Sequence, residues 1–273
     1  MIVENHALWG EESTEDYPAT FTYLGAEPLP DKPNGRRPAV IICGGGAFTH
    51  IAPHEQDPVA FAFLDHGYQA FVLNYVTSST GDVSFPHPQA DLAKMVATVR
   101  ANADEWHVDP KRVCVVGFSA GGMICASLAT QWKTGPFAAL AGARPDDIRP
   151  DAVVLGYPVI TSGEFRHDGS ICNLCGDDAA LRGTMSLENQ VSDGLPPFYI
   201  WHTVEDAAVP VQNSMLLATA LTAHKVPFEL HLFAHDGHGT STCTQEVNTP
   251  NRHNSAWVPL CTDWLADTLD FHL

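Results

Sequence analysis

The hydrophobic positions of this chain fall into a regular alternation of two patterns. Six short runs are apolar almost throughout, which is typical of strands covered on both faces of a sheet: residues 39–43, 70–74, 113–116, 152–155, 198–201 and 228–233. Amphipathic segments with the spacing of helices lie between and after these runs, at residues 56–66, 88–104, 120–132, 211–225 and 256–271. Because strand and helix alternate, the pattern predicts an α/β fold with a mostly parallel, doubly wound sheet flanked by helices.

Two stretches depart from this alternation. Residues 1–36 are polar and rich in turn-forming residues, and their one alternating segment, 19–24, predicts an antiparallel edge strand or hairpin. Residues 157–196 contain five glycines and few periodic apolar positions, which predicts a small cap over the site or a long loop. No linker, repeat or low-complexity tract divides the chain, so we expect residues 1–273 to form a single domain.

The most informative local feature follows the third apolar run. Residues 117–121 read Gly-Phe-Ser-Ala-Gly and lead into an amphipathic segment, so Ser119 stands in the turn between a strand and a helix. This G-x-S-x-G pattern is typical of a nucleophile elbow, in which glycines on both sides of the serine relieve a strained turn. Such a turn exposes the serine Oγ beside the backbone N–H groups at the start of a helix.

A serine nucleophile needs a base and a carboxylate that orients it, and after such an elbow the acid precedes the histidine along the chain. Asp206 follows the fifth apolar run, and His238 follows the sixth between two glycines. We assign Asp206 as the acid and His238 as the base. Glu205 and His235 compete for these roles, but the Val-Pro pair shortly after Asp206 and the free backbone around His238 favour the assigned residues. We expect the other twelve histidines to be structural or at the surface.

A glycine-rich loop after the first apolar run supplies a fourth element. Residues 43–48 read Cys-Gly-Gly-Gly-Ala-Phe, and such backbone can approach a ligand and turn its N–H groups toward a developing oxyanion. We predict an oxyanion hole built from the amides of Gly46, Ala47 and Ala120, with Gly45 as a further donor. A phosphate-binding loop is the alternative, but the G-x-G-x-x-G spacing and the downstream lysine of a P-loop are absent.

Composition and charge narrow the range of partners. The chain has 273 residues, of which 45% are hydrophobic, and a formal charge of −18 at pH 7. A chain this acidic, without a basic stripe, is unsuited to nucleic acids and anionic membranes, which favours a neutral or cationic ligand, and we expect a small neutral ester as the substrate. No apolar stretch is long enough to span a membrane, and residues 1–6 lack the features of a signal peptide. The oligomeric state is left open, and a homo-oligomer fits the sequence.

The cysteines point to a reducing compartment. The seven cysteines are an odd number, and Cys43, Cys114 and Cys125 lie inside apolar segments. This is typical of reduced thiols that act as small hydrophobes, so we expect a cytoplasmic protein. Cys172 and Cys175 have the spacing of a redox or metal pair, but no second pair accompanies them, which favours a structural role without a metal.

Taken together, these segments resemble a known family. They are similar to bacterial carboxylesterases of the acetyl xylan esterase-like type, relatives of the hormone-sensitive lipase group within the α/β-hydrolase superfamily. The resemblance rests on residues 44–48, 67–75, 117–122, 201–210 and 237–239. It implies an α/β-hydrolase fold and the hydrolysis of short acyl esters, often acetyl groups on sugars, without a metal or organic cofactor. Many relatives carry a histidine before the loop glycines, where this chain has Gly44.

Two other functions compete with a serine esterase. The same triad cleaves amides, so an arylformamidase-like or peptidase-like amide hydrolase is the alternative within enzymes. A non-catalytic binding module with a hydrolase fold is the alternative outside them. Such modules usually have a degraded triad, whereas Ser119, Asp206 and His238 are all present. The sequence therefore favours a serine esterase that forms an acyl-enzyme and acts on short-chain, chiefly acetyl, esters.

Overall fold

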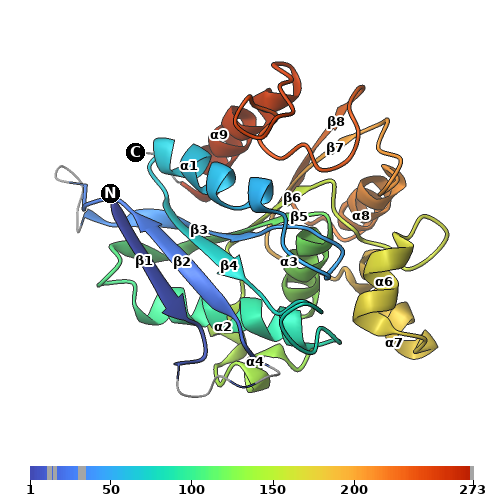
Figure 1. The fold of residues 1–273 in the computed structure, drawn as a ribbon, viewed down its shortest axis with the longest axis horizontal. Helices are drawn as coiled ribbons and strands as arrows, with labels where there is room; N and C mark the ends of the chain where they lie inside the picture. Colours follow the sequence, from blue (N-terminus) through green and yellow to red (C-terminus); the bar gives the residue numbers. More distant parts are fainter. Residues whose placement is uncertain (11–13, 15–16, 30–34, 271–273) are drawn as a thin grey trace.

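A twisted sheet of eight strands organises the computed structural model, with helices on both faces (Figure 1). The structure describes residues 1–10, 14, 17–29 and 35–270. The strands are β1 (Ile2–Ala7), β2 (Thr20–Gly25), β3 (Arg37–Cys43), β4 (Gln69–Asn74), β5 (Val108–Phe118), β6 (Ala152–Gly156), β7 (Phe198–Thr203) and β8 (Phe228–Phe233). Their order across the sheet is β1-β2-β4-β3-β5-β6-β7-β8. Strand β2 pairs antiparallel with β1 and β4, and every other pairing is parallel.

The predicted α/β fold with a mostly parallel sheet is confirmed. Strands β6 and β7 are buried at every position and β3 at nearly every position, since helices cover both faces of the sheet. Strand β5 begins at Val108, earlier than its apolar run, because residues 109–112 are polar or partly exposed yet still continue the strand. A pattern of hydrophobicity cannot detect that first part.

The sequence predicts either an antiparallel edge strand or a hairpin for the segment 19–24. The hairpin is confirmed, and the segment is not at the edge, because β2 pairs with both β1 and β4. Strand β2 lies where the alternating segment predicted it, and β1 is its partner at the edge of the sheet. Four of the six β1 positions are exposed and none is fully buried. A strand with solvent on so much of its surface needs no alternation of apolar residues, which is why the sequence did not reveal β1 itself.

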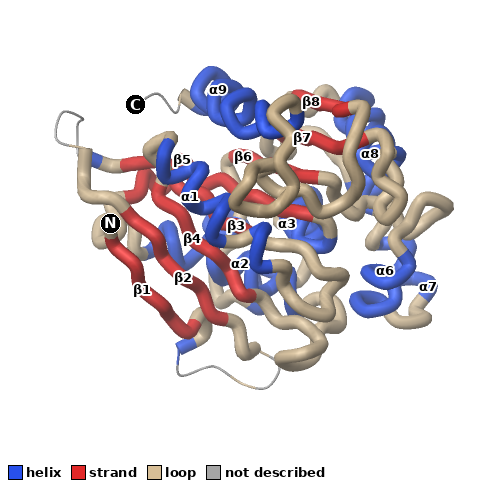
Figure 2. Tube along the Cα trace, turned by 45° about the horizontal axis from the view of Figure 1, so that its top comes forward, coloured by secondary structure: helices blue, strands red, loops and turns tan. Residues whose placement is uncertain are grey.

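The helices form a layer on each face of the sheet. They are α1 (Asp57–Asp65), α2 (His87–Ala101), α3 (Ala120–Gln131), α4 (Phe137–Leu140), α5 (Pro145–Ile148), α6 (Asp168–Cys175), α7 (Ala179–Thr184), α8 (Gln212–Ala223) and α9 (Trp257–Leu269). Residues from α2, α3 and α8 pack into one hydrophobic cluster, and residues from α1 and α9 pack into another. Figure 2 shows the sheet between these layers, twisting from β1 to β8. The five predicted helices are present, although the predicted end of the last one, at 271, lies outside the described residues.

The stretch 157–196 is an insertion that contains helices. Helices α6 and α7 lie beside α8 (Figure 1), and a short 3-10 turn, Leu187–Gln190, follows them. Helix α6 has only eight residues, of which it buries Ile171, Leu174 and Cys175 among others. A helix this short carries about two turns of periodicity, which is too little to detect in a sequence.

All seven cysteines are free thiols, and six of them are buried, with Cys172 exposed. Among the described residues, no helix is both long and apolar enough to cross a membrane. The cytoplasmic location stays a prediction.

Candidate active site

Ser119 occupies the single position between the end of β5 and the start of α3. Its backbone has φ 53° and ψ −119°, a conformation that costs a residue with a side chain about 1–3 kcal/mol. The Ser119 amide donates to the Gly156 carbonyl oxygen at 3.1 Å, and the Ser119 carbonyl accepts from the Val159 N–H at 3.0 Å. These backbone hydrogen bonds hold the strained turn, and they fix the serine at the carboxyl edge of the parallel strands.

The two glycines of the elbow leave no room for a side chain. A Cβ on Gly117 would lie 2.5 Å from the Gly121 carbonyl oxygen, and a Cβ on Gly121 would lie 2.1 Å from that of Cys43. The atoms in the way belong to the backbone, which cannot rotate aside as a side chain can. The sequence interpretation of these glycines is therefore confirmed: β5, α3 and the end of β3 approach too closely at this point for any other residue.

Three side chains from separate segments form a chain of hydrogen bonds at this edge. Ser119 Oγ lies 2.8 Å from His238 Nε2, and His238 Nδ1 lies 2.6 Å from Asp206 Oδ2. Because an ionised carboxylate only accepts hydrogen bonds, Nδ1 carries a proton, and in the neutral ring Nε2 accepts a hydrogen bond from the serine hydroxyl. The structure thus brings together the three residues that the sequence singled out, in a geometry that suits removal of the serine proton.

Asp206 accepts more hydrogen bonds than the sequence suggests. Its Oδ1 accepts from the amides of Ala208 and Val209, both at 2.9 Å, and its Oδ2 accepts from His202 at 3.2 Å as well as from His238. Burial raises the pKa of Asp206, but the hydrogen bonds from His202, His238 and the backbone outweigh it and hold that pKa well below its usual range. The carboxylate is therefore ionised at neutral pH.

His202 is a functional candidate that the sequence analysis grouped with the structural histidines. It is completely buried at the end of β7. Its Nε2 lies 2.9 Å from the Val209 carbonyl oxygen in addition to Asp206, and its Nδ1 lies 2.8 Å from Ser214 Oγ. Since both partners of Nε2 are acceptors, Nε2 carries the proton and Nδ1 accepts from the serine hydroxyl. Its only signal in the sequence is its position directly after the fifth apolar run, four residues before Asp206.

The glycine loop after β3 approaches the candidate nucleophile closely. A Cβ on Gly45 would lie 2.7 Å from the Cβ of Ser119. The Gly45 N–H donates to the Glu55 carboxylate at 2.6 Å, so the prediction of Gly45 as an oxyanion donor is wrong for this structure. The sequence could not reveal this, because Glu55 has no motif and reaches the loop from a 3-10 turn, Pro53–Glu55.

The other three predicted donors have free amides. Gly46 and Ala47 have φ values of 130° and 54°, which turn this part of the loop. Ala120 is the first residue of α3, where an amide has no partner within the helix. The amides of Gly46, Ala47 and Ala120 donate no hydrogen bond to any described residue. They can therefore serve a ligand.

The buried carboxylate of Glu55 links the glycine loop after β3 to the segment that follows β6. Glu55, which is 2% exposed, accepts from Gly45 and also from the Tyr157 hydroxyl, at 2.6 Å. That hydroxyl accepts in turn from the Ser241 N–H at 2.9 Å, and the Tyr157 ring packs edge-on against His238 with centroids 4.9 Å apart. Burial, with the nearby Glu55 carboxylate, raises the pKa of Tyr157 well above its usual value, so the hydroxyl keeps its proton.

We expect Tyr157→Phe to lower kcat by about 10-fold to 100-fold while KM changes little. Phenylalanine keeps the ring against His238 but removes the hydroxyl that joins Glu55 to Ser241. The substitution leaves Glu55 and the Ser241 N–H without this partner, and an unsatisfied buried polar group costs about 1–3 kcal/mol. A loss of similar size in transition-state stabilisation, through poorer positioning of His238, lowers kcat by about 10-fold to 100-fold. Steady-state kinetics on p-nitrophenyl acetate would measure the change.

Tyr199→Phe is the matched control for this prediction. Tyr199 is equally buried, and its hydroxyl donates to the Trp257 carbonyl oxygen at 3.1 Å, but its ring packs against His231 and Trp264 instead of His238. Equal losses of kcat in the two variants, or none in Tyr157→Phe, would contradict the role given to the Tyr157 hydroxyl.

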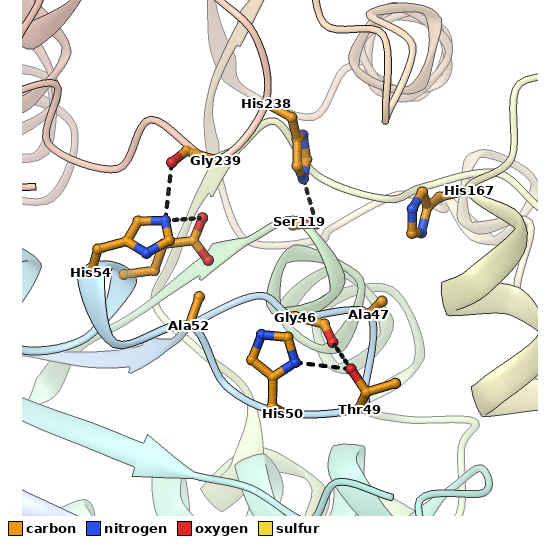
Figure 3. A pocket seen from close by; sticks show the side chains of 11 residues that line it. Gly46, Ala47, Thr49, His50, Ala52, His54, Ser119, His167, His238 and Gly239 are labelled. Carbon is orange, nitrogen blue, oxygen red and sulfur yellow. Dashed lines mark hydrogen bonds and ion pairs between the residues drawn. The ribbon is translucent and has the colours of Figure 1, made fainter. Parts of the chain in front are cut away.

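These elements line a cavity of about 280 Å³ in front of Ser119 that is open to solvent (Figure 3). Its walls contain one carboxylate, four histidines and otherwise small or hydroxylic residues. The lining comprises Gly46, Ala47, Thr49, His50, Ala52, His54, Glu55, Ser119, His167, His238 and Gly239. Within the described parts of the chain, no group of three or more His, Cys, Asp or Glu residues is arranged to hold a metal ion.

The sequence of this chain is similar to a protein family and to several curated proteins. The BD-FAE family matches residues 28–221. The endo-1,4-beta-xylanase B of Butyrivibrio fibrisolvens is 35% identical over 237 residues, which cover 84% of this chain and 35% of that protein. The acetylxylan esterase of Xylanibacter ruminicola is 31% identical over 190 residues, 67% of this chain and 36% of that protein. The chain therefore spans only about a third of the length of these curated relatives.

Solved structures are also similar to this chain over nearly its whole length. The acetyl ester-xyloside bifunctional hydrolase of Caldicellulosiruptor lactoaceticus superposes with a TM-score of 0.80 at 34% identity. The match covers 93% of this chain and 89% of that one. The likeness thus extends well beyond the BD-FAE match in the sequence.

Proposed function

The chain belongs to the BD-FAE family and has the α/β-hydrolase fold, and from this premise we propose that it is a carboxylic ester hydrolase that acts on short-chain acyl esters, chiefly acetyl esters of sugars. The observation that carries the proposal is the hydrogen-bonded chain of Ser119, His238 and Asp206, with separations of 2.8 and 2.6 Å, facing the cavity. The names of two relatives, an acetylxylan esterase and an acetyl ester-xyloside hydrolase, support the acetyl group and the sugar.

The proposed reaction has two steps through an acyl-enzyme. His238 takes the proton of Ser119 as Oγ attacks the ester carbonyl, and Asp206 holds the imidazole in the correct tautomer and stabilises its positive charge. His238 then gives the proton to the leaving alcohol. Water enters and attacks the acyl carbonyl as His238 removes one of its protons, and the tetrahedral intermediate then releases the acid while His238 returns that proton to Ser119 Oγ.

The negative charge of each tetrahedral intermediate needs donors that already point to it. We assign this role to the free amides of Gly46, Ala47 and Ala120. Gly45 contributes in a different way, because its hydrogen bond to Glu55 fixes the loop that carries the first two donors. Each donor of this kind typically contributes about 3–4 kcal/mol to stabilisation of the transition state.

The cavity volume limits the acyl group. At about 280 Å³ it lies at the small end of ligand pockets, which typically measure about 300–1,000 Å³, and it must hold both the acyl group and part of the alcohol. We expect kcat/KM for p-nitrophenyl esters to be highest for acyl chains of two to four carbons and to fall by about 10-fold or more at eight. A series from two to twelve carbons measures this, and a maximum at the longest chains would contradict it.

The same assays separate the proposed esterase from the amide hydrolase that competes with it. Acetylated xylosides, aryl acetates and N-formyl anilides are compared at equal concentration, with Ser119→Ala as the control for background hydrolysis. The proposal expects the acetyl esters to be the better substrates by kcat/KM. A higher kcat/KM for the formyl amides would favour the amide hydrolase instead.

A further inference from the structure

The insertion between β6 and β7 contributes one side chain to the active-site cavity. His167 immediately precedes α6 and lies across the cavity from His54, with Ser119 between them (Figure 3). No motif marks this histidine, and the proposed reaction leaves it without a role. It is half-buried, so it contacts both the protein and whatever enters the cavity.

The hydrogen bonds of His167 fix where its proton lies. The Ser170 N–H donates to Nδ1 at 3.2 Å, and Ser170 Oγ lies 2.9 Å from the same nitrogen. Because a backbone N–H can only donate, Nδ1 carries no proton and the neutral ring is protonated at Nε2. Burial, followed by the influence of His238, lowers the pKa of His167, which favours this neutral form. Nε2 forms no hydrogen bond with the described residues, so its N–H is available to a ligand.

Helix α6 holds this donor in a fixed position relative to the glycine loop. Asn173 lies in α6, and its side-chain amide donates to the Ala47 carbonyl oxygen at 2.7 Å. The helix also buries Ile171 and Leu174 against the hydrophobic core. The segment that carries His167 is therefore tied directly to the residue proposed as an oxyanion donor.

The chemistry of an acetyl ester leaves one use for a further donor in the cavity. The amides of Gly46, Ala47 and Ala120 serve the carbonyl oxygen, and the methyl group of an acetyl carries no acceptor. The remaining oxygens of the substrate belong to its alcohol. A donor that is already positioned rejects an alcohol without a matching acceptor, because its N–H is then left unpaired.

We propose that His167 determines specificity for the alcohol part of the substrate, by donating its Nε2–H to a hydroxyl or ring oxygen adjacent to the acetylated carbon. This inference rests on the proposed esterase function and makes it more specific. The preferred alcohol is polyhydroxylated, as in a sugar, and a plain alkyl alcohol forfeits this hydrogen bond.

The test compares two esters of matched shape. Methyl 2-O-acetyl-β-D-xylopyranoside carries a ring oxygen and hydroxyls near the ester, whereas cyclohexyl acetate has a ring of similar size without them. His167→Asn keeps a side-chain oxygen that can cap α6 but is too short to place a donor in the cavity. In this variant we expect kcat/KM to fall by about 10-fold to 100-fold for the xyloside and by less than about 3-fold for cyclohexyl acetate.

Two further variants complete the experiment. His167→Phe fills the space of the ring without a donor and should show the same selective loss. His224→Asn, at an exposed histidine paired with Asp193, should leave kcat/KM unchanged for both esters. Equal losses on both esters in the His167 variants, or no loss on either, would overturn the inference. Failure of the esterase function itself looks different, because the unaltered enzyme would then hydrolyse neither ester above the Ser119→Ala background.

Discussion

Replacing Ser119 by alanine is expected to lower kcat for p-nitrophenyl acetate by about 10⁴-fold to 10⁶-fold, because the attacking oxygen is removed while the donors and the base remain. The fold should persist. Alanine can occupy the same strained turn, and the lost hydroxyl has His238 as its only hydrogen-bond partner among the described residues. Initial rates at saturating ester, together with the melting temperature from circular dichroism, measure both expectations.

Ser127→Ala is the matched control for this prediction. Ser127 lies on the same helix α3 and is completely buried, and among the described residues its hydroxyl hydrogen-bonds a methionine sulfur, at 3.8 Å. Its replacement should leave kcat within about 3-fold of the unaltered enzyme, since it touches no reacting group. Activity in Ser119→Ala close to that of Ser127→Ala would remove Ser119 from the mechanism.

The second largest effect is expected for Asp206→Asn, which should lower kcat by about 10³-fold to 10⁴-fold. Asparagine can turn its NH₂ group toward His238 Nδ1, which would then accept rather than donate. The proton would move to Nε2, the nitrogen that must accept from Ser119. Glu205→Gln is the control, because Glu205 is exposed and its carboxylate pairs with His235 instead, at 3.1 Å.

The same substitution should change the pH dependence of stability. The pKa of Asp206 is lower in the folded protein than in the unfolded chain, so ionisation stabilises the fold above about pH 4 and this contribution is lost as the pH falls further. The difference in unfolding free energy between the unaltered protein and Asp206→Asn should therefore shrink between about pH 5 and pH 3. A difference that grew on acidification would have the wrong sign for a depressed pKa.

Residues that act within a local motif could be found from the sequence. The elbow around Ser119 is encoded by its own glycines, and Asp206 and His238 follow recognisable strand ends. The rivals Glu205 and His235 could be weighed but not excluded, and the structure resolves the choice by pairing them with each other at the surface. The buried strands of the sheet could be predicted for the same reason, since each of them carries its own apolar run.

Residues that act through tertiary contacts could not be found in this way. Glu55 and Tyr157 are 102 positions apart and meet only because the loops after β3 and β6 converge beside His238. His167 depends on a helix too short to leave a periodic pattern. The assignment of Gly45 failed for a related reason, because the direction of one N–H depends on a carboxylate ten residues away.

Covalent labelling with a fluorophosphonate, which reacts with an activated serine, tests most directly whether Ser119 is the nucleophile. We expect one adduct per chain by intact-protein mass, located by peptide mapping on Ser119, with none in Ser119→Ala and much slower labelling in Asp206→Asn. Undiminished labelling of Ser119→Ala, or an adduct that maps to another residue, would contradict the claim that Ser119 is the nucleophile.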